Sequence, residues 1–216
     1  SAAGIRYRVH RSPPAWEDLL RPFGLRPLPD LLMDRNSGAL SVTFGKRSIE
    51  VEAPFQLRNL PAFRDFRNFR TPARGGLSFV AASALEIDPQ RVSAAGFRAD
   101  VVATTTEHAW VRALPDGDFD NDDLSADLTV PKQNLMVLLT PEDPWSGQIL
   151  VAASASPFRN GIITRSGYGH AVFIKDLMRT FAAPQRLVRT RVERPRSEPL
   201  PPMTDASRVL WRSFTV

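Results

Sequence analysis

The order of apolar segments between Ile149 and Val192 constrains the fold more than any other feature of the sequence. Residues 149–153 form a short, partly β-branched apolar run of the kind found in buried parallel strands. The stretch after Gly169 carries two neighbouring apolar rows at helical spacing, which predicts an amphipathic helix. Residues 187–193 alternate between apolar and polar side chains, as a strand does. This βαβ order predicts an α/β fold with a mixed, mostly parallel sheet and helices on both faces.

The rest of the chain supplies further predicted elements. A helix is expected from the capping residue Ser12 to Gly24, because glycine can adopt the left-handed conformation that ends helices. Its apolar residues recur at helical spacing and are expected to be buried: Trp16, Leu19, Leu20 and Phe23. Residues 41–52 alternate on both sides of Gly45-Lys46 and predict a β-hairpin. Shorter apolar runs predict strands at residues 31–33, 77–80, 99–104 and 135–139.

The two ends of the chain differ from its middle. We expect residues 1–193 to form one α/β domain and the Pro-rich residues 194–216 to be extended. Residues 1–4 lack the charged and apolar regions of a signal peptide. No apolar run reaches the roughly 18 residues that a membrane helix needs. We therefore expect an excised soluble piece of a longer protein.

Composition excludes several kinds of chemistry. The sequence has no cysteine, so a thiol nucleophile, thiolate-bound zinc and iron–sulfur clusters are excluded. The formal net charge is +5, and almost all of the 28 basic residues are arginines. These arginines are spread along the chain and interleaved with acids, whereas nucleic-acid binding calls for a clustered basic face. We therefore expect no nucleic-acid partner.

Five segments carry a resemblance to a known family. They are LLRPFGLRPLPDLLMD (residues 19–34), LSFVAASALEI (77–87), ADVVATTTEHAWV (99–111), GQILVAASASPFRN (147–160) and GHAVFIKDLMRTFAAPQRLVRTRVERP (169–195). In their order and texture they resemble the C-terminal part of the extracytoplasmic domain of gliding-motility-type ABC-transporter auxiliary components. The chain departs from this family where Ser154-Ala155-Ser156 replaces the usual acidic pair, and it lacks the family's preceding half.

The resemblance implies a function. It predicts a non-catalytic accessory domain, used for binding or assembly, of a membrane transport or gliding-type ABC system. The location it implies is periplasmic or otherwise extracytoplasmic, with the full-length protein anchored in the membrane by a helix outside this chain, to which residues 194–216 would lead. Its partners would be a membrane transporter or other protein subunits, and the protein would not be an enzyme.

Alternating aromatic and basic residues mark a candidate interface. They recur at a period of three, which is typical of a short amphipathic or 3₁₀-like turn with its arginines in solvent. Arginine and aromatic side chains dominate contact energies at protein interfaces. The alternative is that the aromatic residues belong to the core. The candidate interface residues are Phe63, Arg64, Phe66, Arg67, Phe69 and Arg70.

An alternative function is a small-ligand-binding α/β domain or a degenerate hydrolase. Its site would lie after the strand at residues 149–153, where α/β proteins place ligands. The nucleophile elbow Gly-x-Ser-x-Gly is missing, and His170 and Asp176 lie on different faces of their predicted helix. The candidate ligand-binding residues are Ser154, Ser156, Arg159, Asn160 and His170.

An acidic loop is the remaining candidate site. Its carboxylates occupy positions 1, 3, 5, 7 and 12 of a calcium-loop pattern, because a hard cation is bound by several converging oxygens. The alternative is a solvated acidic turn, since position 12 is Asp instead of the bidentate Glu. Apart from calcium, we expect no cofactor. The candidate calcium ligands are Asp116, Asp118, Asp120, Asp122 and Asp127.

Overall fold

The computed structural model describes residues 7–8, 15–58, 76–113, 118–119, 129–143, 147–164 and 167–182. The chain divides into two units, Ser1–Ala182 and Ala183–Val216, and every described element belongs to the first. The strand predicted at residues 187–193 and the predicted boundary at residue 194 lie outside the described residues. Among the residues described, no helix has the length and apolar character needed to cross a membrane.

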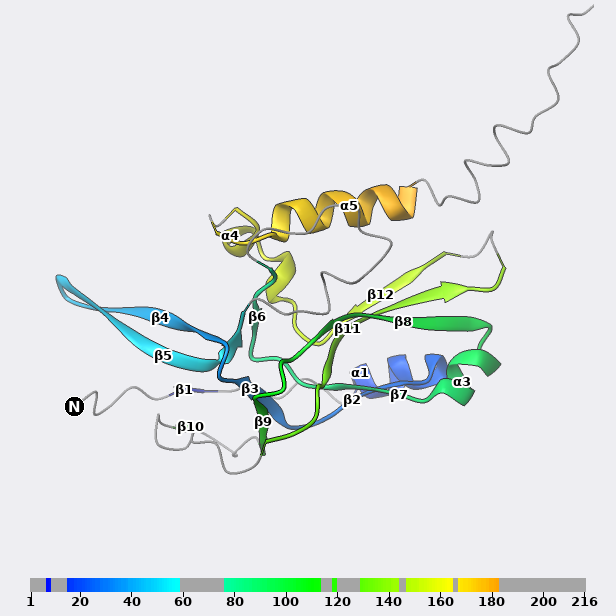
Figure 1. Cartoon of the computed structure of the whole chain (residues 1–216), viewed down its shortest axis with the longest axis horizontal. Coiled ribbons are helices and arrows are strands. Elements are labelled where there is room, and N and C mark those ends of the chain that lie inside the picture. The colour runs from blue at the N-terminus through cyan, green and yellow to red at the C-terminus, as the bar shows by residue number, and fades with distance from the viewer. Residues whose placement is uncertain are drawn as a thin grey trace, which may run out of the picture. The chain divides into compact units, whose positions relative to one another are not determined.

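Short strands make up most of the described elements (Figure 1). The strands are β1 (Tyr7–Arg8), β2 (Leu25–Pro27), β3 (Leu31–Asp34), β4 (Ser37–Phe44), β5 (Arg47–Leu57), β6 (Phe79–Val80), β7 (Leu85–Ile87), β8 (Phe97–Thr104), β9 (Ala109–Arg112), β10 (Asp118–Phe119), β11 (Asn134–Pro141) and β12 (Ile149–Ala152). The helical elements are α1 (Ala15–Leu20), η1 (Arg21–Phe23), α3 (Pro89–Ala94), η3 (Ser156–Phe158), α4 (Asn160–Ile163) and α5 (His170–Ala182).

Every strand pairing in the described part of the chain is antiparallel. The strands form small sheets in the orders β12-β11-β8, β4-β5-β6, β2-β7, β3-β9 and β1-β10. The predicted α/β fold with a mostly parallel sheet is therefore wrong. The predicted hairpin is confirmed and is longer than expected, since β4 and β5 pair from Phe44 and Arg47 back to Ser37 and Leu57.

The prediction of a parallel sheet treated short apolar strands, which are buried on both faces, as parallel strands. The apolar runs at 135–139 and 149–153 do form strands, but β11 and β12 are antiparallel neighbours, with Val137 opposite Val151. The link between them, residues 142–148, is too short for the crossover of a dozen or more residues that parallel strands require. The length of this link therefore determines that β11 and β12 are antiparallel, whereas the apolar character of the two strands is compatible with either direction.

The central strand β11 is buried on both of its faces. Met136 and Leu138 enter one hydrophobic cluster, which also holds Phe173 and Leu177 of α5. Val137 and Leu139 enter a second cluster, together with Leu20, Leu25 and Val92 near α1 and α3. Helix α5 and the pair α1 and α3 therefore pack against opposite faces of the β12-β11-β8 sheet (Figure 1). Full burial of such side chains stabilises the fold by about 1.5–3 kcal/mol each.

The predicted position of helix α1 is confirmed, but the predicted burial of two of its apolar residues is not. The helix runs into η1 and ends at Gly24, which has φ 70° as predicted. Leu20 is buried, whereas Trp16 is 53% and Leu19 57% exposed. The prediction that these two residues belong to a buried stripe is therefore wrong. The predicted cap Ser12 lies outside the described residues.

Strand β3 is held by residues distant in the sequence. It pairs with β9 from Leu31 opposite Arg112 to Asp34 opposite Ala109. All four of its residues are buried. A smaller third cluster forms there from Leu31 and Met33 with Ala53, Phe55 and Trp110.

Candidate functional site

The predicted ligand residues Ser154 and Ser156 bind the backbone of β6. The chain leaves β12 at Ala152 and passes the edge of β6, where the Ser154 hydroxyl donates to the carbonyl oxygen of Val80 at 2.7 Å. The Ser156 hydroxyl accepts from the Val80 amide at 2.8 Å and lies 3.0 Å from the Ser154 hydroxyl. The two hydroxyls therefore act as a neighbouring strand would, by satisfying both backbone groups of Val80.

His170 binds the same segment from the start of α5. Its side chain is fully buried, and its Nε2 accepts a hydrogen bond from the backbone amide of Ser78 at 3.1 Å. A nitrogen that accepts cannot carry a proton, so the ring proton of the neutral imidazole lies on Nδ1. Burial lowers the pKa of His170 below its ordinary value, because the charged ring would lose its hydration. His170 is therefore a neutral acceptor at physiological pH.

We call Ser154, Ser156 and His170 the β6 clasp. Of the five predicted ligand residues, these three are brought together at the backbone of residues 78–80. The other two, Arg159 and Asn160, are exposed at the start of α4 and take no part in the clasp. In the clasp the acceptor nitrogen of His170 is occupied by a backbone amide, so it cannot take a proton from a serine hydroxyl. The clasp is arranged to hold β6 and not to activate a nucleophile.

The remaining predicted site residues fall mostly outside the described residues. This applies to the whole candidate interface from Phe63 to Arg70 and to Asp116, Asp120, Asp122 and Asp127 of the candidate calcium loop. Asp118 lies in β10, opposite Arg8 of β1. Within the described part of the chain, no group of three or more His, Asp or Glu side chains is placed to hold a metal ion.

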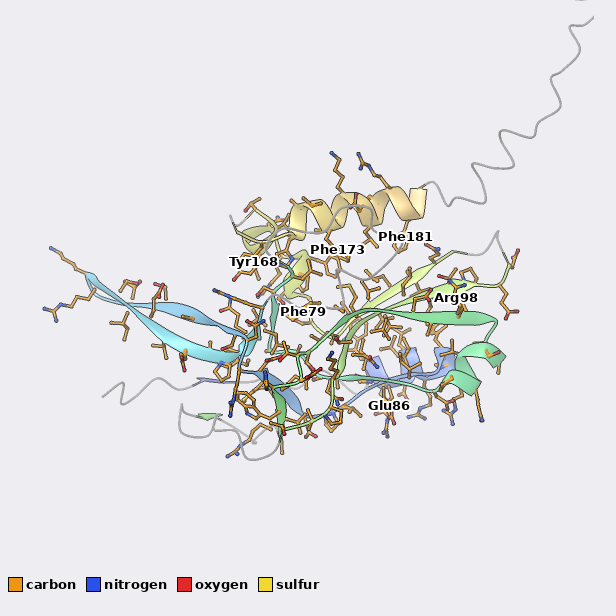
Figure 2. All side chains as sticks on the ribbon, viewed as in Figure 1. Phe79, Glu86, Arg98, Tyr168, Phe173 and Phe181 are labelled. Atoms are coloured by element: carbon orange, nitrogen blue, oxygen red, sulfur yellow. The ribbon has the colours of Figure 1, made fainter. Side chains whose placement is uncertain are left out.

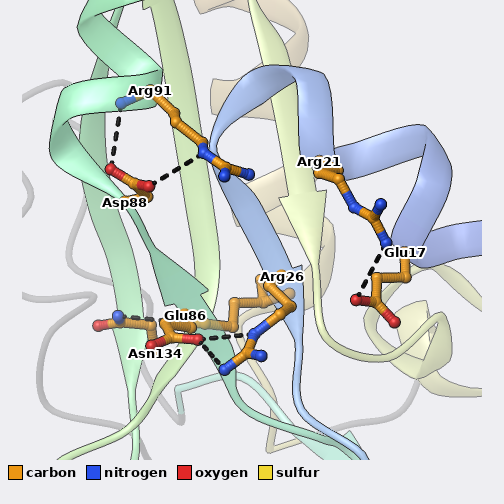
Figure 3. A network of polar contacts seen from close by, with 8 residues as sticks. Glu17, Arg21, Arg26, Glu86, Asp88, Arg91 and Asn134 are labelled. Atoms are coloured by element: carbon orange, nitrogen blue, oxygen red, sulfur yellow. Dashed lines mark hydrogen bonds and ion pairs between the residues drawn. The ribbon is translucent and has the colours of Figure 1, made fainter.

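A charged groove lies between α1 and η1 on one side and β7 and α3 on the other. It has a volume of about 410 Å³ and includes Leu25 and Ile87 in its lining. Three arginines line it and each is paired with an acid in the groove (Figure 3). The pairs are Arg21 with Glu17 at 3.5 Å, Arg26 with Glu86 at 2.5 Å, and Arg91 with Asp88 at 3.3 Å.

These ion pairs contribute little to the stability of the fold. The arginine side chains are 58–62% exposed, and exposed pairs are worth about 0–1 kcal/mol each because water screens both charges. The groove holds as many carboxylates as guanidinium groups, so it is not an anion site. Because each pair is weak, the charged groups of a partner can replace one member of a pair at small cost to the stability of the fold.

The two exposed apolar residues of α1 lie on the same helix as Glu17, and Arg21 begins η1 directly after it. We call Trp16, Leu19 and the three groove arginines Arg21, Arg26 and Arg91 the α1 surface. Exposed tryptophan and arginine side chains are the residue types most enriched among binding hot spots. Sequence reasoning missed this surface, because the helical spacing of Trp16 and Leu19 was assigned to the core. The signal was Leu20 and Phe23, which already supply the inward side of this short helical segment.

The sequence matches no protein-family model and no curated protein.

Proposed function

We propose that this chain is a non-catalytic accessory domain that binds a protein partner through its α1 surface. The observation that carries the proposal is the exposure of Trp16 and Leu19 on α1, the helix that also contributes Glu17 to the groove lined by exchangeable Arg–carboxylate pairs. Burying an exposed tryptophan against a partner gives a large gain, since aromatic side chains cover much apolar area. Guanidinium groups around such an anchor supply directional hydrogen bonds to carboxylates.

The β6 clasp supports the non-catalytic part of the proposal. A hydrolase needs a serine hydroxyl within reach of a base that is free to accept its proton. Here the hydroxyls of Ser154 and Ser156 and the Nε2 atom of His170 all bind the backbone of residues 78–80. The same engagement disfavours the alternative of a small-ligand site formed by these residues.

The partner class and the location follow from the family resemblance. We propose a subunit of a membrane transport or gliding-type ABC system as the partner, and an extracytoplasmic, membrane-anchored location for the full-length protein. The five segments that resemble the family include residues 19–34 and 77–87, which contribute Arg21, Arg26 and Glu86 to the groove.

The absence of cysteine permits a site-directed test. Leu19→Cys in the full-length protein is coupled to a photo-crosslinking maleimide and irradiated in membranes of the source organism. We expect a crosslink to a transporter subunit, identified by mass spectrometry. Ser48→Cys, on the exposed part of β5, is the matched control and should give no such product. Equal labelling from both positions, or from neither, would contradict the proposal.

The affinity for the identified subunit gives a second readout. Trp16→Ala should weaken binding by about 2 kcal/mol or more, as expected for an aromatic anchor at the centre of an interface. Ile49→Ala removes an apolar side chain that is also exposed, at 41%, but lies on the hairpin. That control should bind as the unchanged protein does.

A further inference from the structure

The outer side of α5 carries apolar and basic residues without an exposed acid. Ile174, Met178 and Phe181 follow the i, i+4, i+7 spacing of one helical stripe, in which Ile174 is half-buried and packs against the core. Met178 is 63% and Phe181 38% exposed, whereas Phe173 and Leu177 of the same helix are buried in the core. Figure 2 marks Phe173 and Phe181 on α5. Met178 and Phe181 are therefore apolar side chains that stay exposed after the helix has packed.

The charged residues of α5 are arranged to favour an anionic partner. Lys175 and Arg179 are exposed and lie four residues apart, on the side adjoining the stripe. The acid of the helix, Asp176, is buried and lies 3.5 Å from Arg179. Figure 2 shows nitrogen-tipped side chains rising from the outer side of this helix. The exposed charge of α5 is therefore entirely positive.

The sequence that continues from α5 has the same sign. Residues 183–216 contain seven arginines and three acids, so most of the formal net charge of +5 lies in this stretch. Basic residues near an anionic membrane add roughly 1 kcal/mol each to binding at the surface. This charge bias and the charge of α5 favour the same kind of partner.

We propose that the outer face of α5 lies on an anionic phospholipid surface, with Met178 and Phe181 inserted among the headgroups and Lys175 and Arg179 bound to phosphates. An apolar stripe flanked by basic side chains is how interfacial helices bind membranes, because apolar burial and attraction to anionic lipid add together. Long basic side chains reach the phosphates while their aliphatic parts remain against apolar surface. This inference refines the membrane-associated location in the proposed function, but it uses a surface distinct from the α1 surface.

A dye placed on α5 tests the insertion directly. Met178→Cys is coupled to an environment-sensitive fluorophore and mixed with phosphatidylcholine vesicles, with or without phosphatidylglycerol. We expect a blue shift and a rise in intensity on the vesicles that contain phosphatidylglycerol, and little change on phosphatidylcholine alone. The same dye at Ser48→Cys on β5 should not respond. A silent dye at position 178 on anionic vesicles, or equal responses at both positions, would overturn the proposal.

Vesicle sedimentation of the unlabelled chain separates α5 from the basic sequence that follows it. Met178→Ser with Phe181→Ser should lower the partition coefficient on anionic vesicles at least about tenfold, since two large apolar side chains no longer insert. The matched control, Ile49→Ser with Leu19→Ser, also removes two exposed apolar side chains without a change of charge and should sediment as the unchanged chain does. Unchanged binding of the α5 variant would overturn the proposal and assign the binding to other residues. No partner protein is present, so either result leaves the crosslinking test of the α1 surface independent.

Discussion

Asp34 accepts hydrogen bonds from both the backbone amide and the hydroxyl group of Thr106, at 2.8 and 2.6 Å. The same fully buried carboxylate also accepts from the amide of Asn36 at 2.9 Å. Thr106 lies between β8 and β9, and Asp34 is the last residue of β3. One carboxylate thus fixes the turn after β3 to the connection that leads into β3's own partner strand.

Asp34→Asn should destabilise the protein by about 2–3 kcal/mol, because the amide group of asparagine places donors opposite donors and loses a charge-assisted bond. The free energy of unfolding, measured in urea, tests this. Glu50→Gln changes an exposed acid on β5 and is expected to leave the free energy of unfolding unchanged. A loss for Asp34→Asn no larger than for this control would refute the role of the carboxylate.

The stability of the fold should fall as the pH drops below about 6.5 because of His170. Its pKa is lowered in the folded state from an ordinary value of 6.5, so the unfolded chain takes up the proton first. The contribution is fully present above this value and is lost progressively toward the lowered folded-state pKa. Urea unfolding at about pH 7.5 and about pH 5.5 measures the effect above the range in which carboxylates titrate.

Substitution of His170 gives the control for this pH dependence. His170→Gln keeps an acceptor that can reach the Ser78 amide but does not titrate, so the difference in stability between the two pH values should shrink. His108→Gln removes an exposed histidine and should leave that difference unchanged. If both variants behave alike, His170 is not the group responsible.

Ser156→Ala should cost about 1–3 kcal/mol, since the amide of Val80 loses its acceptor in a partly buried place. Arg159→Ala and Asn160→Ala, which change exposed neighbours, are expected to have effects within about 0.5 kcal/mol. Thermal unfolding followed by circular dichroism compares the three. Full stability of Ser156→Ala would mean that the β6 clasp does not hold the strand.

Gly24→Ala should destabilise the protein more than Gly45→Ala, although both glycines have positive φ. A Cβ atom at position 24 would lie 2.7 Å from the Val92 amide nitrogen, whereas a Cβ at position 45 meets nothing within 4 Å. Gly45→Ala therefore reports backbone strain alone, of about 1–2 kcal/mol, and Gly24→Ala adds a clash with α3. Equal losses in urea unfolding would show that α3 moves aside without cost.

Most of the described strands and helices were predicted from the sequence, but the pairing of the strands was not. Residues 41–52 predicted the hairpin because alternation around Gly45-Lys46 is a local signal, and the helix after Gly169 was predicted from its spacing. The pairing of β11 with β8 and β12 was not predicted, since a fully buried apolar strand such as β11 looks the same between parallel and antiparallel neighbours. The link at residues 142–148 indicates the antiparallel pairing of β11 with β12, because it is too short for a parallel crossover.

The candidate site was predicted only in part, for a similar reason. Ser154, Ser156 and His170 were singled out as polar residues beside a strand and a helix start, and the structure does bring them together. Their use was not predictable, because it depends on Ser78 and Val80, which lie more than 70 positions away in the chain. Exposure of Trp16 and Leu19 depends likewise on which other elements pack against α1, which spacing alone does not reveal.

The pairing of β3 with β9 has a consequence for how the chain folds during synthesis. Leu31–Asp34 leave the ribosome well before Ala109–Arg112, so β3, with three apolar residues, lacks its partner while the β4–β5 hairpin, whose contacts are local, forms first. Closing so long a loop costs chain entropy before it gives any contact. A nascent or truncated chain that ends before Arg112 therefore carries an open apolar strand edge, which makes it a substrate for chaperones and prone to aggregation.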